Sequence, residues 1–91
     1  MELKIVSIRD DFIELEVLNE DPSILDSLAE ILEKIEGVEY SGIIIEHPLT
    51  NKTILRIRTN KEKICARDAL VSAVELLSSI ANELVEKVKQ F

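Results

Sequence analysis

The 91-residue chain has the size and composition of one small folded domain. Hydrophobic residues make up 46% of it, and two Gly and two Pro are too few for a disordered, Pro-rich chain. The net charge of −7 argues against autonomous nucleic-acid binding, which needs a surplus of Lys and Arg. No apolar run is long enough to span a membrane, and the lone Cys65 excludes an internal disulfide. We therefore expect a single cytoplasmic domain over residues 1–91, with no direct binding to nucleic acid or membrane.

The first 37 residues predict a β-hairpin followed by a helix. Residues 2–8 and 12–18 are typical of strands, because apolar and polar residues alternate in them. Asp21 and Pro22 are expected at the N-cap and first position of a helix, and Gly37 is expected to end it in the left-handed conformation. The apolar residues of this helix cover about 160° of its circumference, wider than the stripe of about 100° that packing on one sheet requires. The extra width predicts a second contact surface.

The rest of the chain predicts a second hairpin and a much longer helix. Residues 38–46 and 53–59 are expected to form strands, joined by a loop over residues 47–51. Residues 63–91 contain no Gly or Pro, and their apolar residues recur at spacings of three, four and seven. About 25 helical residues span about 37 Å, whereas a compact chain of this size is only about 30 Å across. The apolar far end of this helix is therefore expected to be covered by another protein.

Together these elements predict an α+β fold with two layers and the order β-β-α-β-β-α. Two helices are expected on one face of a four-stranded, mainly antiparallel sheet. Both helices carry more apolar surface than this sheet can cover, so we predict that they form an interface with a partner protein. The candidate interface residues are Ile24, Leu25, Leu28, Ile31, Leu32, Leu70, Val74, Leu77, Ile80, Ala81, Leu84 and Val88.

Charge is distributed unevenly along the chain. Residues 1–46 carry 13 acidic and three basic residues, whereas residues 47–91 carry five acidic and eight basic ones. A basic cluster in the third quarter could contact a nucleic acid or an acidic partner, but pairing within the chain, with Glu14, Glu16 and their neighbours, is the favoured interpretation. The cluster consists of Lys52, Arg56, Arg58, Lys61, Lys63 and Arg67.

The sequence carries no pattern typical of catalysis, metal binding or cofactor binding. His47 and Cys65 are the only histidine and the only cysteine, so they cannot supply the four ligands of a structural zinc site. Two Gly are too few for a loop that binds phosphate. Cys65 is expected to pack as a small hydrophobic residue near the start of the long helix. We predict a protein that is not an enzyme on its own.

Eight short segments, in this order and spacing, form a recognisable pattern: residues 1–5 (Met-Glu-Leu-Lys-Ile), 13–17 (Ile-Glu-Leu-Glu-Val), 20–21 (Glu-Asp), 37–40 (Gly-Val-Glu-Tyr), 47–49 (His-Pro-Leu), 51–52 (Asn-Lys), 55–59 (Leu-Arg-Ile-Arg-Thr) and 68–70 (Asp-Ala-Leu). With them the chain resembles archaeal RNA polymerase subunit L, the counterpart of the eukaryotic subunit eleven and of one bacterial α-subunit N-terminal half. The similarity covers almost the whole chain. One departure is clear: the family usually continues from Glu-Asp with His-Thr-Leu-Gly-Asn, whereas this chain has Pro22-Ser23-Ile24-Leu25-Asp26, so the contacts of that motif are not carried over.

The resemblance implies a non-catalytic assembly subunit of a DNA-directed RNA polymerase. Subunit L pairs through its helices with a larger relative, the D subunit of the polymerase, and this heterodimer is the platform on which the large catalytic subunits assemble. Two alternatives remain at this stage. One is a homodimeric scaffold outside the polymerase that uses the same helix faces on a second copy, and the other is a small ligand-binding or enzymatic domain centred on His47 and the basic cluster.

Overall fold

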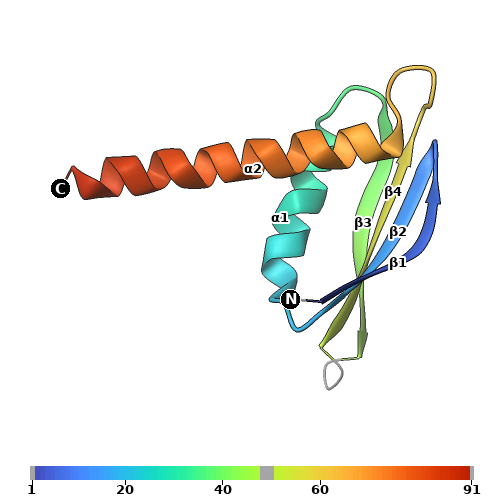
Figure 1. Ribbon diagram of the computed structural model, residues 1–91, viewed down its shortest axis with the longest axis horizontal. Coiled ribbons are helices and arrows are strands. Elements are labelled where there is room, and N and C mark those ends of the chain that lie inside the picture. Colours follow the sequence, from blue (N-terminus) through green and yellow to red (C-terminus); the bar gives the residue numbers. More distant parts are fainter. Residues whose placement is uncertain (1, 48–50, 91) are drawn as a thin grey trace.

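The computed structural model describes residues 2–47 and 51–90, which form two β-hairpins, each followed by a helix (Figure 1). This order confirms the predicted fold class. The predicted loop falls partly on residues 48–50, which lie outside the described residues, but His47 is wrongly placed in that loop, because its backbone pairs with Lys52. The elements are β1 (Glu2–Arg9), β2 (Phe12–Leu18), α1 (Pro22–Glu33), β3 (Val38–His47), β4 (Lys52–Thr59) and α2 (Ala66–Lys89).

The four strands form one antiparallel sheet with the spatial order β1-β2-β4-β3. Residues directly opposite each other on neighbouring strands share a face of the sheet. Ile13, Ile57 and Ser41 are aligned in this way across β2, β4 and β3, and all three are buried. The Ser41 hydroxyl donates a 2.6 Å hydrogen bond to the carbonyl of Ala29 in α1, so this face is the one that the helices cover. We call it the inner face, and the opposite one the outer face.

The start of α1 follows its sequence signals. Asp21 is the N-cap, and its carboxylate accepts a 2.9 Å hydrogen bond from the backbone N–H of Ser23. The hydrogen bonds from Ser23 hold the pKa of Asp21 below its ordinary value, because they stabilise the charged form. Pro22 follows at the first helical position, where its missing N–H leaves no hydrogen bond unmade.

The end of α1 differs from the prediction. The helix stops at Glu33, and Gly37 lies four residues further on, in a turn that leads into β3. Gly37 does have the expected left-handed conformation, with φ of +95°. Its role is a close approach between segments: its carbonyl accepts a 2.8 Å hydrogen bond from the N–H of Asn60. The left-handed glycine therefore brings the β4–α2 connection against the turn and does not cap the helix.

Replacing Gly37 by Ala is expected to lower the free energy of unfolding by about 1–3 kcal/mol, because the substitution adds backbone strain and a steric clash. A Cβ at this position would lie 2.9 Å from side-chain carbons of both Ile64 and Lys63. Urea unfolding of the purified variant measures the loss, and Ser72→Ala on the exposed face of α2 is the control. Equal stability of the two variants would contradict the close approach.

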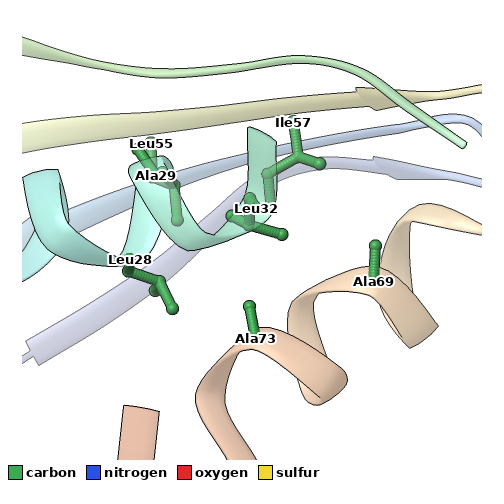
Figure 2. Packing of buried hydrophobic residues seen from close by; sticks show 7 residues of the cluster. All are labelled: Leu28, Ala29, Leu32, Leu55, Ile57, Ala69 and Ala73. Carbon is green, nitrogen blue, oxygen red and sulfur yellow. The ribbon is translucent and has the colours of Figure 1, made fainter. Parts of the chain in front are cut away.

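The core lies where α1 crosses between the sheet and the first half of α2. Figure 2 shows Ala69 and Ala73 pointing from α2 toward the leucines of α1, which in turn pack on the sheet. Small residues on α2 let the two helices approach closely, so Leu32 is fully buried between three elements. The core cluster consists of Leu28, Ala29, Leu32, Leu55, Ile57, Ala69 and Ala73.

The second half of α2 leaves the body of the protein. Figure 1 shows the helix starting beside the sheet, passing α1 and continuing far beyond both. Every residue over 78–90 is exposed, whereas Ala66, Ala69 and Ala73 near its start are buried. The principal dimensions are 44 × 37 × 16 Å, so the molecule is far from spherical. The predicted overhang of the long helix is confirmed.

Candidate partner-binding surface

One side of α2 carries an apolar stripe that runs the length of the helix. Its members are separated by four or three residues, which places them along one side of a helix of 3.6 residues per turn. Leu84 and Val88, near the free end, are each 63% exposed. The α2 stripe consists of Leu70, Val74, Leu77, Ala81, Leu84 and Val88.

The structure divides the predicted interface residues into three groups. Leu25, Leu28 and Leu32 are buried in the chain's own fold, and Leu28 and Leu32 belong to the core cluster between the sheet and α2. Ile31, Leu70 and Leu77 are half-buried at the edge of the core. The exposed group consists of Ile24, Val74, Ile80, Ala81, Leu84 and Val88. Because the three buried leucines have almost no surface left for a partner, the proposed interface rests on the half-buried and exposed groups.

An apolar groove extends the same surface onto the sheet. The helices pack over β3, β4 and β2, so the inner face of β1 remains uncovered: Leu3 and Ile5 are each 60% exposed. Both belong to the inner face, since they lie opposite Val17 and Leu15. The groove lies between β1, β2 and the start of α2, and it has a volume of about 340 Å³. It is lined by Leu3, Ile5, Ile8, Ile13, Leu15, Arg67, Leu70 and Val71.

This groove was not predicted, because the apolar surplus was assigned to the helices alone. Apolar and polar residues alternate imperfectly over residues 2–8, and the structural cause is a β-bulge between Ile5 and Ser7 that shifts the register and returns Ile8 to the inner face. The number of helices could have predicted an uncovered part of the sheet. A four-stranded sheet is about 19 Å wide, and one short helix together with the first turns of a second helix cannot cover it.

Two of the six cations in the basic cluster pair with Glu14 and Glu16 on the outer face, in agreement with the favoured interpretation. Arg56 and Glu14 are joined by a 2.6 Å contact between Nε and Oε1, and Lys52 and Glu16 by a 3.2 Å contact between Nζ and Oε1. The first pair joins directly opposite positions of β2 and β4, and the second joins diagonal ones. These two cations of the basic cluster therefore stabilise the sheet and offer no free positive surface.

The part of the chain that the structure describes offers little for chemistry. Within residues 2–47 and 51–90, no group of three His, Cys, Asp or Glu side chains is placed to hold a metal ion. Cys65 is half-buried at the N-cap of α2, as expected of a small side chain near the helix start, and its side chain makes no capping hydrogen bond. Neither described helix has the apolar stretch needed to cross a bilayer. The prominent feature is instead the apolar surface formed by the α2 stripe and the groove.

The sequence that forms this β-β-α-β-β-α scaffold matches a known family. The sequence model of the RNA polymerase Rpb3/Rpb11 dimerisation domain matches residues 13–87. The chain belongs to this family. The match runs from β2 into the last turns of α2, so it includes both helices and three of the four strands, but not β1, which supplies Leu3, Ile5 and Ile8 to the groove.

Curated relatives and a solved structure agree with the family assignment. The chain is 35% identical over 89 residues to the DNA-directed RNA polymerase subunit Rpo11 of Saccharolobus shibatae, covering 98% of this chain and 96% of that protein. It is 32% identical over 90 residues to Rpo11 of Sulfolobus acidocaldarius, covering 99% of each. The crystal structure of RNA polymerase subunit L from Thermoplasma acidophilum superposes with a TM-score of 0.85 at 24% identity, covering 98% of this chain and 86% of that one. The predicted resemblance to the subunit L family is confirmed.

Proposed function

We propose that this protein is the small, non-catalytic assembly subunit of an archaeal DNA-directed RNA polymerase. In this proposal it pairs with a larger, D-like polymerase protein, and the heterodimer forms the platform for the large catalytic subunits in the cytoplasm. The relatives are named as polymerase subunits and the family is described as a dimerisation domain, which supports both parts of the proposal.

The observation that carries the proposal is the exposed apolar far half of α2. Exposed apolar surface costs about 25 cal/mol for each Å² kept in water. The α2 stripe continues for about three turns beyond the core, although nothing in the described chain covers it there. A partner helix laid along the stripe would remove this surface from water, and the spacing of four and three suits side chains packing between those of a second helix.

The apolar groove beside β1 gives the partner a second point of attachment. Leu70 belongs to both the α2 stripe and the groove, so the two apolar surfaces are continuous. A partner that covers both would bury residues of the sheet and of the helix at once. Obligate pairs of subunits bury large, apolar interfaces, and this surface has that character.

The non-catalytic part of the proposal follows from the names of the relatives, which are subunits of a larger enzyme, and from the description of the family as a dimerisation domain. In the proposal, the reaction of the polymerase is carried by other subunits, and this chain contributes binding surface.

The test is co-expression with the D-like protein from the same source. We expect a stable one-to-one complex by size-exclusion chromatography with light scattering, and poor solubility or self-association of the chain when it is expressed alone. A tight, soluble homodimer that does not exchange with the D-like protein would favour a homodimeric scaffold. A well-behaved monomer that ignores the D-like protein would overturn the proposal.

A further inference from the structure

The outer face of the sheet carries a row of cationic and aromatic side chains that the proposed pairing does not use. Phe12 lies opposite Arg9 on one side and opposite Arg58 on the other, and Arg58 lies opposite Tyr40. Each of the four strands contributes one member, and cations alternate with rings along the row. We call Arg9, Phe12, Arg58 and Tyr40 the outer row.

The two arginines of the outer row are held by the ring between them. The guanidinium carbon of Arg9 and that of Arg58 each lie 5.3 Å from the centroid of the Phe12 ring. Stacking on an aromatic ring orients a guanidinium and leaves its N–H donors free to bind a further group. Both arginine residues are exposed, so those donors face solvent.

These arginines differ from the other cations of the same face. Arg56 and Lys52 each contact a glutamate on β2. Among the side chains that the structure describes, over residues 2–45 and 51–90, no carboxylate lies within ion-pair distance of Arg9 or Arg58. The cations at one end of the outer face are therefore paired within the chain, while the other end presents two arginines that form no ion pair.

Tyr40 completes the row with a ring in a defined position. It is half exposed, and its phenol oxygen lies so close to Gly42 that a Cβ there would be only 2.7 Å away. The absence of a side chain at Gly42 thus lets the tyrosine lie along β3. The half-exposed ring offers a flat apolar contact at the β3 end of the row, which suits an apolar residue next to an acidic one.

We propose that the outer row is a docking site for an acidic segment of a second protein, bound through two carboxylates. Arg9 and Arg58 lie on strands separated by β2, so their strand axes are about 10 Å apart. Each guanidinium can bind one carboxylate through two parallel N–H···O bonds. The row lies on the face opposite to α1 and α2, so this segment and the proposed pairing partner can bind at the same time.

Charge decides between an acidic protein segment and a nucleic acid. A nucleic acid is a continuous polyanion, so its phosphates beyond the outer row would meet nearby carboxylates. Glu14 and Glu16 lie along the same face, and Asp10 and Asp11 adjoin the row at the hairpin turn. The chain as a whole carries a net charge of −7, which repels a long polyanion. A short segment with two carboxylates can instead meet the two arginines alone.

The experiment uses the purified chain and a short fluorescein-labelled peptide with two acidic residues and one Phe, and binding is followed by fluorescence anisotropy. We expect Arg9→Gln combined with Arg58→Gln to weaken binding by at least about 10-fold, since two charge-assisted contacts are lost. Lys34→Ala combined with Lys87→Ala removes the same charge at distant exposed sites, and should leave binding within about twofold, because separated surface charges interact weakly.

Three results would overturn the proposal. The first is absence of peptide binding up to millimolar concentration. The second is equal weakening by the two double variants, which would make the binding a general charge effect. The third is tighter binding of a labelled single-stranded oligonucleotide than of the acidic peptide. None of these outcomes depends on pairing through α2, so failure here is distinguishable from failure of the proposed function.

Discussion

Replacing Leu84 by Asp is expected to weaken the complex with the D-like partner by at least about 100-fold, because burying an unpaired charge in an interface costs several kcal/mol. Leu84 is 63% exposed in the isolated chain, so the substitution removes no contact from the chain's own core. Leu77 belongs to the same stripe but packs against that core, so a charge there would disturb the fold as well. Isothermal titration or competition against the wild-type chain measures the affinity.

The matched control for this variant is Ser79→Asp. Ser79 is exposed on the same half of α2 but lies on the side of the helix away from the stripe. Both variants add one negative charge to the same helix, and both should unfold at nearly the same temperature. If Ser79→Asp weakens pairing as much as Leu84→Asp, the partner does not bind along the stripe.

Truncating Leu32 to Ala is expected to lower the free energy of unfolding by about 3 kcal/mol, within the range found for buried leucines. Leu32 is fully buried where α1, the sheet and α2 meet, so the cavity cannot be filled by movement of one element alone (Figure 2). A domain of this size has a total stability of only about 5–10 kcal/mol. Urea unfolding followed by circular dichroism should therefore show a large shift of the midpoint.

Ile24→Ala provides the comparison on the same helix. Ile24 is half exposed on α1, so its truncation should change the free energy of unfolding by no more than about 0.5 kcal/mol. A similar loss for the two variants would mean that Leu32 is not at the centre of the core. Ile24 also belongs to the proposed interface. Because its variant should keep nearly the same free energy of unfolding, any loss of pairing in that variant can be assigned to the interface.

The sequence predicts the order of elements because each one carries strong local signals. Asp21 and Pro22 mark the start of α1, and the alternation of Ile13, Leu15 and Val17 marks β2. The overhang of α2 was predictable from length alone, because 24 helical residues span about 36 Å. The exposed part of the proposed interface follows from the same periodicity.

The remaining features depend on contacts between segments far apart in the chain. Leu28 and Leu32 occupy the same periodic pattern as exposed residues of α1, and they are buried in one cluster with Ala69 and Ala73 because α2 crosses α1. Gly37 signals a helix end in the sequence, although its backbone serves the approach of residues 60–64. The stacking of Arg9 and Arg58 on Phe12 requires the register of three strands, which no local pattern contains.

The second half of α2 extends beyond the rest of the chain, and all of its residues are exposed (Figure 1). This arrangement affects how fast its backbone hydrogen bonds open. An isolated helical segment of about 12 residues is only marginally stable in water. In the free chain, the amide hydrogens beyond Ser78 should therefore exchange with solvent far sooner than those near Ala69. In the proposed complex, association orders this segment as well as covering it, so part of the binding free energy is consumed in forming the last turns of the helix.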